Sequence, residues 1–581
     1  MKNFLTSCAG TIVGILILFF ILIAYMISMV SFEKPVVVGE GSVLHIKLDR
    51  PISELELDEP LADVVPGADN ESIGLVELRD AIRYAKTDDR IKGIYFNAPQ
   101  VGAAFSTLDE IRKAIEDFRT SGKWVIAYSN GYTEGGYYVS TAADNVYMNP
   151  TGQVELNGLA IEITFFKKLF DKLEIKPQVF RVGDFKSAVE PFVRENMSEE
   201  NRLQLTEMVN GIYSHMTSEI ARSRKLPVER VKEIADKMLV RDSKQAVEFG
   251  LIDSLYYDDQ IKSVIQTRLG LDEKRTIPFV KYSDYTKIVQ TDNNSSKNEI
   301  AVIVAEGEII PGKGQTGVVG STTIREQIRR ARTSDRVKAI VIRVNSPGGV
   351  FGAADEMWRE VYLASQTKPV IGSMGDYAAS GGYYLSMACD TIVAQPNTIT
   401  GSIGVFSVLF DLSSFMGDKL GITSEQIKTG EVGDLVTVTR PLSDQEKDIW
   451  QKQTEEVYEI FTKKAAEGRG MSQDDIKKVA SGRVWTGSQA LEKGLVDVLG
   501  SFDDAVRIAA DKAGVGTDYK LRYYPQPKSF LERLFNDYEN DVRTSTLKRE
   551  TGEYYNWFRQ WEHVKEYQGM QARMPFEFII Q

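Results

Sequence analysis

Hydrophobic and polar residues divide the chain into an apolar N-terminal segment and a long body of alternating patterns. Residues 4–30 carry no charged side chain and are rich in Ile, Leu and Phe. A run of ~27 such residues is long enough to cross a bilayer, for which ~20 suffice. The exit from this run, MVSFEK, lacks the small-residue cleavage site of a signal peptide. The pattern therefore predicts an uncleaved membrane anchor within residues 1–35, with Lys2 in the cytoplasm and the body outside.

In the body, short apolar runs alternate with stretches of helical periodicity. Residues 299–305 and 340–344 are β-branched runs of strand length, and residues 323–332 have the spacing of an amphipathic helix. This alternation predicts an α/β fold with buried strands. The polar stretch 281–297 is typical of a linker. The aromatic and charged tail, residues 526–581, is predicted to be helical and docked on the body or on a neighbouring subunit.

The body also repeats itself, at an offset that stays between 244 and 248 residues. The matched pairs are DDRIKGI 88–94 with SDRVKAI 334–340, NAP 97–99 with NSP 345–347, EGGYY 134–138 with SGGYY 380–384, and GLID 250–253 with GLVD 494–497. Chance matches would not keep so constant a spacing, so we interpret the body as a tandem duplication. The predicted copies are residues 40–285 and residues 296–525.

The two copies differ at positions that carry chemistry. The second copy has Ser380 at a turn between an apolar run and a helix, where the first copy has Glu134. The second copy also has Pro-Gly-Gly at 347–349, which leaves backbone N–H groups open to a ligand, whereas the first copy has lost both glycines. Only the first copy has a lysine, Lys186, in the FKSAVEP stretch; the matching residues 431–433 contain none. These complementary losses predict one composite site built from both copies.

Composition and charge narrow the chemistry of that site. The chain has 581 residues, 43% apolar and 26% charged, which fits a large folded body. Its net charge of −12 argues against nucleic acid as the main partner. Cys8 and Cys389 lie in separate apolar runs, and there is no Cys–His cluster, so we expect neither a disulfide nor a metal site nor a cofactor. None of the three histidines lies near a small-residue turn, so a Ser-His-Asp mechanism lacks a base.

Lysine is therefore the candidate base for Ser380. A serine hydroxyl is a weak nucleophile that needs a base in contact with it. Burial lowers the pKa of a lysine from its usual value of about 10.4 toward the working range. The apolar residues that flank Lys186 could supply this burial, whereas Asp184 and Glu190 would oppose it if they pointed inward.

Small-residue turns in the second copy supply the remaining parts of such a site. The N–H groups of Gly349 (or Gly348) and Gly381 could hold a tetrahedral oxyanion, and Ser402 could hydrogen-bond the lysine amine and aim it. A Ser-Gly-Gly turn can also be a close-packed helix start, and a lone lysine can be a surface residue. The uneven distribution over the duplication favours a serine–lysine hydrolase, and both plainer interpretations stay open.

The anchor, the duplication and four motifs together resemble the long form of the signal peptide peptidase A (protease IV) family. The motifs are FRVGDFKSAVEPF 180–192, NSPGG 345–349, GDYAASGGYY 375–384 and TGSIGVF 400–406. The resemblance covers most of residues 40–520. It implies two tandem Clp protease/crotonase-like domains preceded by one transmembrane helix.

The resemblance also implies roles for individual residues. Ser380 matches the nucleophile of the family and Lys186 its general base, Gly349 and Gly381 match its oxyanion positions, and Ser402 matches its lysine-orienting serine. It implies a homotetramer without a cofactor on the outer, periplasmic face of the bacterial cytoplasmic membrane. Its substrates would be apolar peptides, above all the signal-peptide remnants left by preprotein cleavage.

Two other functions fit parts of the sequence. A crotonase-like acyl-CoA enzyme uses the same glycine-rich oxyanion loop without a serine nucleophile, and a membrane-tethered scaffold could keep the fold without catalysis. One more hypothesis concerns the end of the tail, RMPFEFII 573–580, which is apolar enough to enter the enzyme's own cleft. Trimming of the tail by the wild type but not by Ser380→Ala would support it.

Overall fold

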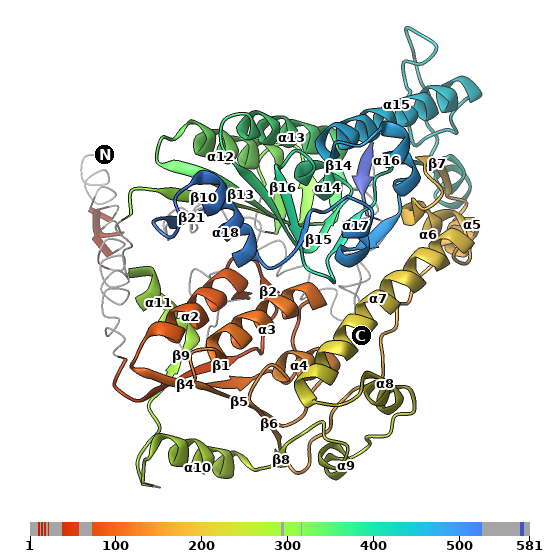
Figure 1. Cartoon of the computed structure of the whole chain (residues 1–581). Coiled ribbons are helices and arrows are strands. Elements are labelled where there is room, and N and C mark those ends of the chain that lie inside the picture. The colour runs from red at the N-terminus through yellow and green to blue at the C-terminus, as the bar shows by residue number, and fades with distance from the viewer. Residues whose placement is uncertain are drawn as a thin grey trace.

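Each repeat is organised around a mainly parallel sheet whose central strands are buried at nearly every position. The computed structural model describes residues 38–56, 72–272, 274–291, 296–314, 317–525 and 570–574, and scattered positions between 10 and 21. In β10 (Glu299–Glu306), for example, seven consecutive residues are buried. Such continuous burial is expected of parallel strands that helices cover on both faces. Figure 1 shows the first repeat below, in red to yellow, and the second above, in green to blue.

The first repeat forms a six-stranded sheet with the order β8-β6-β5-β4-β1-β9. The repeat also contains β2, β3 and β7, which lie outside this sheet. In chain order, the strands of the repeat are β1 (Ser42–Lys47), β2 (Ile52–Ser53), β3 (Ile73–Gly74), β4 (Ile91–Asn97), β5 (Trp124–Ser129), β6 (Asn145–Met148), β7 (Lys176–Val182), β8 (Ser254–Leu255) and β9 (Phe279–Lys281). Its helices are α2 (Leu75–Thr87), α3 (Phe105–Arg119), α4 (Glu134–Ser140), α5 (Lys167–Leu173), α6 (Glu190–Val193), α7 (Glu199–Arg224), α8 (Val228–Asp236), α9 (Ser243–Glu248), α10 (Asp258–Leu269) and α11 (Tyr282–Thr291).

The second repeat has the equivalent order β20-β16-β15-β13-β10-β21, with β17 and β19 added beside β15. The remaining strands of this part are β11 (Glu308–Ile310), β12 (Val318–Gly320), β13 (Val337–Ser346), β14 (Gly348–Val350), β15 (Val370–Ala379), β16 (Thr391–Ala394), β17 (Ile399–Gly401), β18 (Val405–Asp411), β19 (Val484–Thr486), β20 (Val498–Leu499), β21 (Lys520–Tyr524) and β22 (Gln571–Arg573). Its helices are α12 (Ser321–Thr333), α13 (Phe351–Ser365), α14 (Gly381–Ser386), α15 (Asp444–Arg469), α16 (Gln473–Val479), α17 (Gly487–Glu492) and α18 (Phe502–Ala513).

The duplication extends to individual hydrogen bonds. Ser198 and Ser443 cap the N-termini of α7 and α15, two helices of 26 residues each. The hydroxyl of Tyr137 donates to the Leu251 carbonyl at 2.8 Å, and Tyr383 makes the equivalent 3.0 Å bond in the second repeat. The chain is therefore an α/β protein of two tandem repeats.

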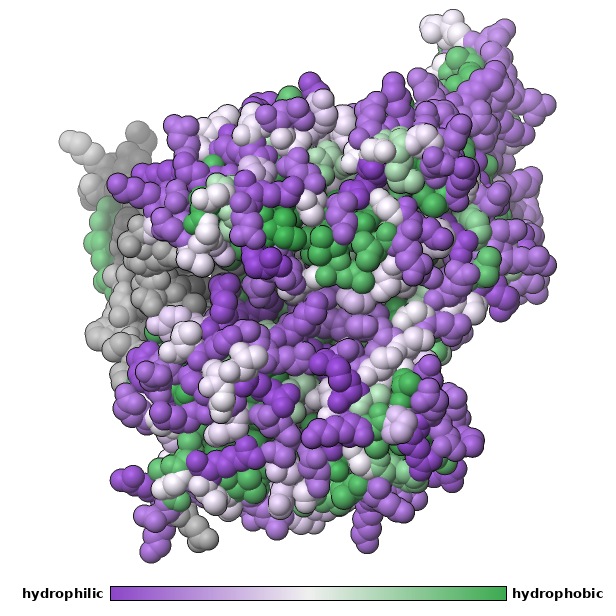
Figure 2. All heavy atoms as spheres, viewed as in Figure 1, coloured by the Kyte–Doolittle hydropathy of each residue, from purple (hydrophilic) through white to green (hydrophobic). Residues whose placement is uncertain are grey.

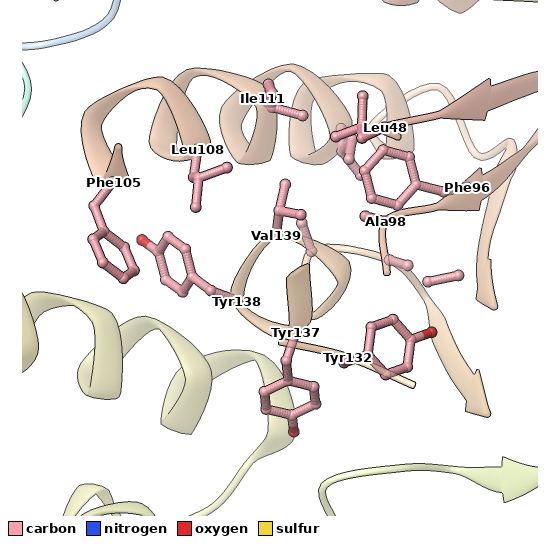
Figure 3. Close-up of a cluster of buried hydrophobic side chains, with 14 of the residues drawn as sticks. Leu48, Phe96, Ala98, Phe105, Leu108, Ile111, Tyr132, Tyr137, Tyr138 and Val139 are labelled. Atoms are coloured by element: carbon pink, nitrogen blue, oxygen red, sulfur yellow. The ribbon is translucent and has the colours of Figure 1, made fainter. Parts of the chain in front are cut away.

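The short helix after β5 shows how the first repeat has filled its core. Tyr138 on α4 faces Phe105 and Leu108 of α3, and Tyr137 points to the opposite side of α4 (Figure 3). All four side chains are buried. Aromatic packing thus fixes α4 in the place that corresponds to α14 of the second repeat.

A third sheet joins the two repeats in the order β12-β11-β14-β22-β18-β7. The strand β7 of the first repeat pairs antiparallel with β18 of the second over seven residue pairs, from Val182 with Val405 to Lys176 with Asp411. In Figure 1 the helix α7 runs from the lower body to the same corner of the upper body. The segment that carries Lys186, which follows β7, is thereby placed beside the second repeat.

Buried polar contacts also join the repeats beneath the strand that leads to Ser380. Arg343 is 1% exposed and donates to Glu54 at 2.9 Å and to Glu110 at 3.4 Å, both in the first repeat. Asp376 on β15 accepts hydrogen bonds from the backbone N–H and the hydroxyl of Thr107, each at 2.7 Å. Buried charges are tolerated only when they are paired in this way.

Two sequence expectations need correction. The polar stretch 281–297 was expected to be a linker, but its first part ends β9 and forms α11, which packs on α2 with Tyr285 fully buried. The tail 526–581 was expected to be helical, but residues 570–574 include the strand β22, and the rest of the tail lies outside the described residues. Both stretches contain short buried segments that the hydropathy pattern does not reveal, because polar residues surround or interrupt them.

The predicted anchor, residues 4–30, lies outside the described residues apart from the scattered positions between 10 and 21. Across the positions that are described, no helix combines the length and the apolar character needed to span a membrane. The face of the body in Figure 2 is largely hydrophilic, with apolar side chains in scattered groups.

Candidate active site

Lys186 reaches the second repeat because the loop after β7 docks on residues 481–482. Gly183 has a positive φ of 105°, and a Cβ on it would lie 2.4 Å from the carbonyl carbon of Ser481. The N–H of Phe185 donates to the Ser481 carbonyl at 3.0 Å. A residue with a side chain at position 183 would push the loop away, so glycine is required there.

The Lys186 side chain is fully buried, and its amine lies within hydrogen-bond distance of three oxygen atoms. Its Nζ lies 2.9 Å from the Ser380 Oγ, 3.0 Å from the Ser402 Oγ and 3.1 Å from the Ser402 carbonyl oxygen. The structure therefore brings three of the five predicted site residues into contact within one chain, across 194 and 216 residues of sequence.

Burial away from water lowers the pKa of the Lys186 amine well below its ordinary value. The two carboxylates that could have opposed this lie elsewhere. Asp184 is exposed, and Glu190 accepts hydrogen bonds from the Ser198 N–H at 3.1 Å and the Asn201 amide at 2.9 Å. The following residues, Ala188 and Val189, pack among the aromatic rings of Phe170, Phe192 and Phe406.

Two glycines make room for the lysine, and the sequence analysis missed one of them, Gly482. Gly482 has a φ of 78°, and a Cβ on it would lie 2.6 Å from the Lys186 Cβ. A Cβ on Gly404 would lie 3.3 Å from the Lys186 Cδ. Gly404 lies in the TGSIGVF motif, whereas the only sequence signal for Gly482 was a Ser-Gly pair, which usually marks a turn.

Ser380 occupies the junction between β15 and α14 in a conformation that side chains rarely adopt. Its φ is 54° and its ψ is −110°. Such a backbone costs ~1–3 kcal/mol and persists only where the surroundings fix it. Here the Ser380 N–H donates to the Gly401 carbonyl at 2.8 Å, and its carbonyl accepts from the Tyr384 N–H at 2.8 Å.

The N–H groups of Gly349 and Gly381 lie side by side next to Ser380. A Cβ on Gly381 would lie 3.2 Å from the Gly349 nitrogen, and a Cβ on Gly348 would lie 2.8 Å from the Gly381 nitrogen. Of the two adjacent glycines, Gly348 donates its own N–H to the Ser346 hydroxyl at 3.2 Å. That leaves Gly349, and not Gly348, to act together with Gly381.

The equivalent position in the first repeat has different chemistry. Glu134 begins α4, and its carboxylate accepts a hydrogen bond from the Gly158 N–H at 3.2 Å. Burial raises the pKa of this carboxyl to about 7. The repeat thus has a carboxyl group in place of the hydroxyl of Ser380.

Histidines and metal ligands do not contribute to the described part of this site. His45 bonds to Asn97 at 2.7 Å and His215 to Asp109 at 3.3 Å, whereas His563 lies outside the described residues. Within the described ranges, no three His, Cys, Asp or Glu side chains are grouped so as to hold a metal ion.

Comparison with known proteins places this sequence in a family. The model of Peptidase family S49 matches residues 117–272 and 363–516, one stretch in each repeat. A chloroplastic serine protease named SPPA from Arabidopsis thaliana is 35% identical over 83% of this chain and 71% of its own length. Protease 4 of Haemophilus influenzae is 32% identical over 93% of this chain and 89% of its own.

More distant similarities cover smaller parts of the chain. A putative signal peptide peptidase SppA of Enterococcus faecium is 34% identical over 31% of this chain and 52% of its own length. Among solved structures, ClpP1 of Listeria monocytogenes matches 35% of this chain and 92% of its own, with 17% identity and a TM-score of 0.23. Because the S49 match spans both repeats and the long relatives align over most of their length, this chain belongs to peptidase family S49 and is a serine protease.

Proposed function

We propose that the chain is a membrane-anchored endopeptidase in which Ser380 is the nucleophile and Lys186 its general base. One observation carries the proposal: the amine of Lys186 lies 2.9 Å from the Ser380 hydroxyl, and both side chains are fully buried. A base must lie within hydrogen-bond reach of the proton that it removes. Burial, which lowers the pKa of the amine, supports its acting as a base near neutral pH.

The hydrogen bonds around the amine support one proton arrangement. A neutral lysine amine has two N–H bonds and one lone pair, and a carbonyl oxygen can only accept. If the two N–H groups are directed to the carbonyl and the hydroxyl of Ser402, at 3.1 and 3.0 Å, the lone pair faces the hydroxyl of Ser380. Ser402 is then a positioning residue that aims the base.

The oxyanion formed by attack on a peptide carbonyl would be held by the N–H groups of Gly349 and Gly381. Backbone donors fixed in a water-poor site stabilise developing charge without reorganising. When Ser380 attacks, its proton passes to Lys186, which then donates it to the leaving amine. The strained backbone of Ser380 presents the hydroxyl beside these donors.

The substrates we propose are cleaved signal peptides and other apolar peptides at the membrane surface. The name of the E. faecium relative and the motifs that this chain shares with long signal peptide peptidases support this substrate class. We further propose two Clp protease/crotonase-like domains, a homotetramer, and an N-terminal anchor in the bacterial cytoplasmic membrane with the body on its outer side. The long apolar run at 4–30 supports the anchor.

A fluorophosphonate probe on the detergent-extracted full chain tests the assignment. We expect the wild type to be labelled and both Ser380→Ala and Lys186→Ala to lose labelling. Ser140→Ala is a matched control, because Ser140 is a fully buried serine at the end of α4 in the other repeat. Labelling that persists in Ser380→Ala would refute the nucleophile, and labelling that persists in Lys186→Ala would refute the base.

A further inference from the structure

We propose that the tail residues 570–574 lie between β14 and β18 as a tethered substrate, so that the bond presented for cleavage is Ala572–Arg573 and Glu308 selects a basic residue after the cut. This inference rests on the proposed function. It adds the register in which a peptide binds, the residue preference on each side of the cut, and a residue that sets one of those preferences.

The backbone of this segment completes the sheet at the site. The strand β22 pairs antiparallel with β14, with Gly348 opposite Arg573 and Gly349 opposite Ala572. Beyond the two ends of this ladder, the Phe351 N–H donates to the Met570 carbonyl at 3.2 Å and the Met574 N–H to the Pro347 carbonyl at 2.7 Å. On its other side β22 pairs with β18. Only the backbone is needed for such binding, as when a peptide adds a strand to a sheet.

The register directs one carbonyl at the oxyanion donors. Hydrogen-bonded and non-bonded pairs alternate along an antiparallel ladder. The two flanking bonds therefore make Gly349 and Ala572 the hydrogen-bonded pair between them. A Cβ on Gly348 would lie 2.2 Å from the Ala572 carbonyl oxygen, and one on Gly381 would lie 3.0 Å from it. The Ala572 carbonyl thus lies where a scissile carbonyl has to lie.

The side chains of the segment fill positions of distinct chemistry. Ala572 is fully buried, so the residue before the cut has to be small. Two residues earlier, Met570 packs on an apolar cluster and lies 3.6 Å from the Thr454 hydroxyl through its sulfur. That cluster consists of Phe180, Leu409, Leu442 and Trp450. It explains how an apolar peptide gains affinity on the acyl side of the bond.

Glu308 explains the preference for a basic residue directly after the scissile bond. The Arg573 side chain is 4% exposed, and its guanidinium donates to the Glu308 carboxylate at 2.7 Å. Glu308 is on β11, which pairs with β14 on the side away from β22. A buried cation is costly without an opposite charge. Peptides with a basic residue after the cut are therefore favoured over neutral or acidic ones.

Cleavage of the tail follows the chemistry proposed for other peptides. Ser380 Oγ bonds to the Ala572 carbonyl carbon and its proton passes to Lys186. The Ala572–Arg573 bond then breaks, and the Arg573 nitrogen takes that proton. Water gives a proton to the same amine and attacks the ester carbon, and the amine returns that proton to Ser380 Oγ as the ester bond breaks. The products are a chain that ends in the Ala572 carboxylate and the peptide 573–581, RMPFEFIIQ.

Mass spectrometry of the purified full chain tests the register. We expect wild-type protein to lose RMPFEFIIQ on incubation and Ser380→Ala to stay intact. Peptide pairs that differ only in Arg or Gln after an Ala test the preference. We expect the wild type to cleave the Arg peptide about 10- to 100-fold faster in kcat/KM, the range of a charged hydrogen bond. Glu308→Gln should lose this ratio, and Glu308→Lys should favour a Glu peptide.

Glu326→Gln is the matched control, because Glu326 is an exposed carboxylate on α12 of the same repeat. It should keep the wild-type ratio. A merely structural role of Glu308 would slow both peptides equally and leave the ratio unchanged, which would overturn the assignment. Ser380-dependent hydrolysis of other peptides, with the tail uncut at Ala572–Arg573, would refute the register and leave the proposed function standing. Absence of any Ser380-dependent hydrolysis would instead refute the proposed function.

Discussion

The burial of Lys186 has a thermodynamic consequence that can be measured without substrate. A lysine that is neutral in the native state and charged when unfolded must release a proton on folding. The unfolded state then binds more protons, so the free energy of unfolding rises with pH by ~1.36 kcal/mol per pH unit. Burial is what lowers the pKa of the native amine. Methionine at the same position has no proton to release and fits the apolar surroundings.

The comparison is best made in the Ser380→Ala background, where self-cleavage is removed and the lysine is kept. We expect Lys186→Met to change the free energy of unfolding by an amount that depends on pH. The substitution forfeits the bonds to Ser402, a pH-independent loss of ~1–3 kcal/mol. Relative to that constant loss, the methionine variant should gain stability as the pH falls from about 10, by ~1.36 kcal/mol per pH unit for as long as the native amine stays neutral.

Urea unfolding followed by tryptophan fluorescence, at a series of pH values, measures this difference. The other titrating groups are shared by the two proteins and cancel in the comparison. A difference between the two that stays constant from neutral to alkaline pH would show that the native amine keeps its proton. Lys186 could not then be the base.

Three further substitutions probe the packing around the site. Gly482→Ala places a Cβ 2.6 Å from the Lys186 Cβ at a φ of 78°, so kcat/KM should fall ~100-fold. Its control is Gly470→Ala, which is also at positive φ but has open space around it. This control should lower the free energy of unfolding by only about 1 kcal/mol and leave activity unchanged. Gly348→Ala fills the space between the oxyanion donors, and kcat should fall ~100- to 1000-fold. Arg343→Met leaves Glu54 buried without its cation, and thermal unfolding should reveal a loss of ~3–5 kcal/mol.

Each of these has an outcome that would contradict it. Equal effects of Gly482→Ala and Gly470→Ala on kcat/KM would mean that the lysine loop does not depend on this close approach. A wild-type kcat in Gly348→Ala would rule out Gly349 and Gly381 as the oxyanion donors. An unchanged melting temperature in Arg343→Met would show that the charges between the repeats do not hold them together.

Much of the fold and the candidate pair of Ser380 and Lys186 could be predicted because both leave local or repeated signals. Buried parallel strands such as β10 contain an uninterrupted apolar run, here residues 300–305, and the duplication allowed each copy to be compared with the other. Ser380 and Lys186 stood out because each is present in only one copy. The contact between them, across 194 residues, could be inferred from that asymmetry and from the family resemblance, and not from any local pattern.

Other features left no such signal because their meaning depends on distant partners. Gly482 is one of 46 glycines, and only its approach to the lysine loop distinguishes it. The helix α11 is polar on one side, and its buried Tyr285 finds its partner on α2. In β22, Gln571 and Arg573 are buried polar residues that a hydropathy pattern assigns to the surface. Their partners are on strands more than 150 residues away in sequence.

The position of β22 between β14 and β18 limits what can reach the serine at all. A chain that pairs on both edges has to arrive unwound and in single file, because a helix or a hairpin has already used its own amide groups. The conformation of a peptide therefore decides whether it can bind, before its side chains are recognised. Folded proteins would be spared for that reason alone, whereas a short peptide, once extended, could bind between the two strands.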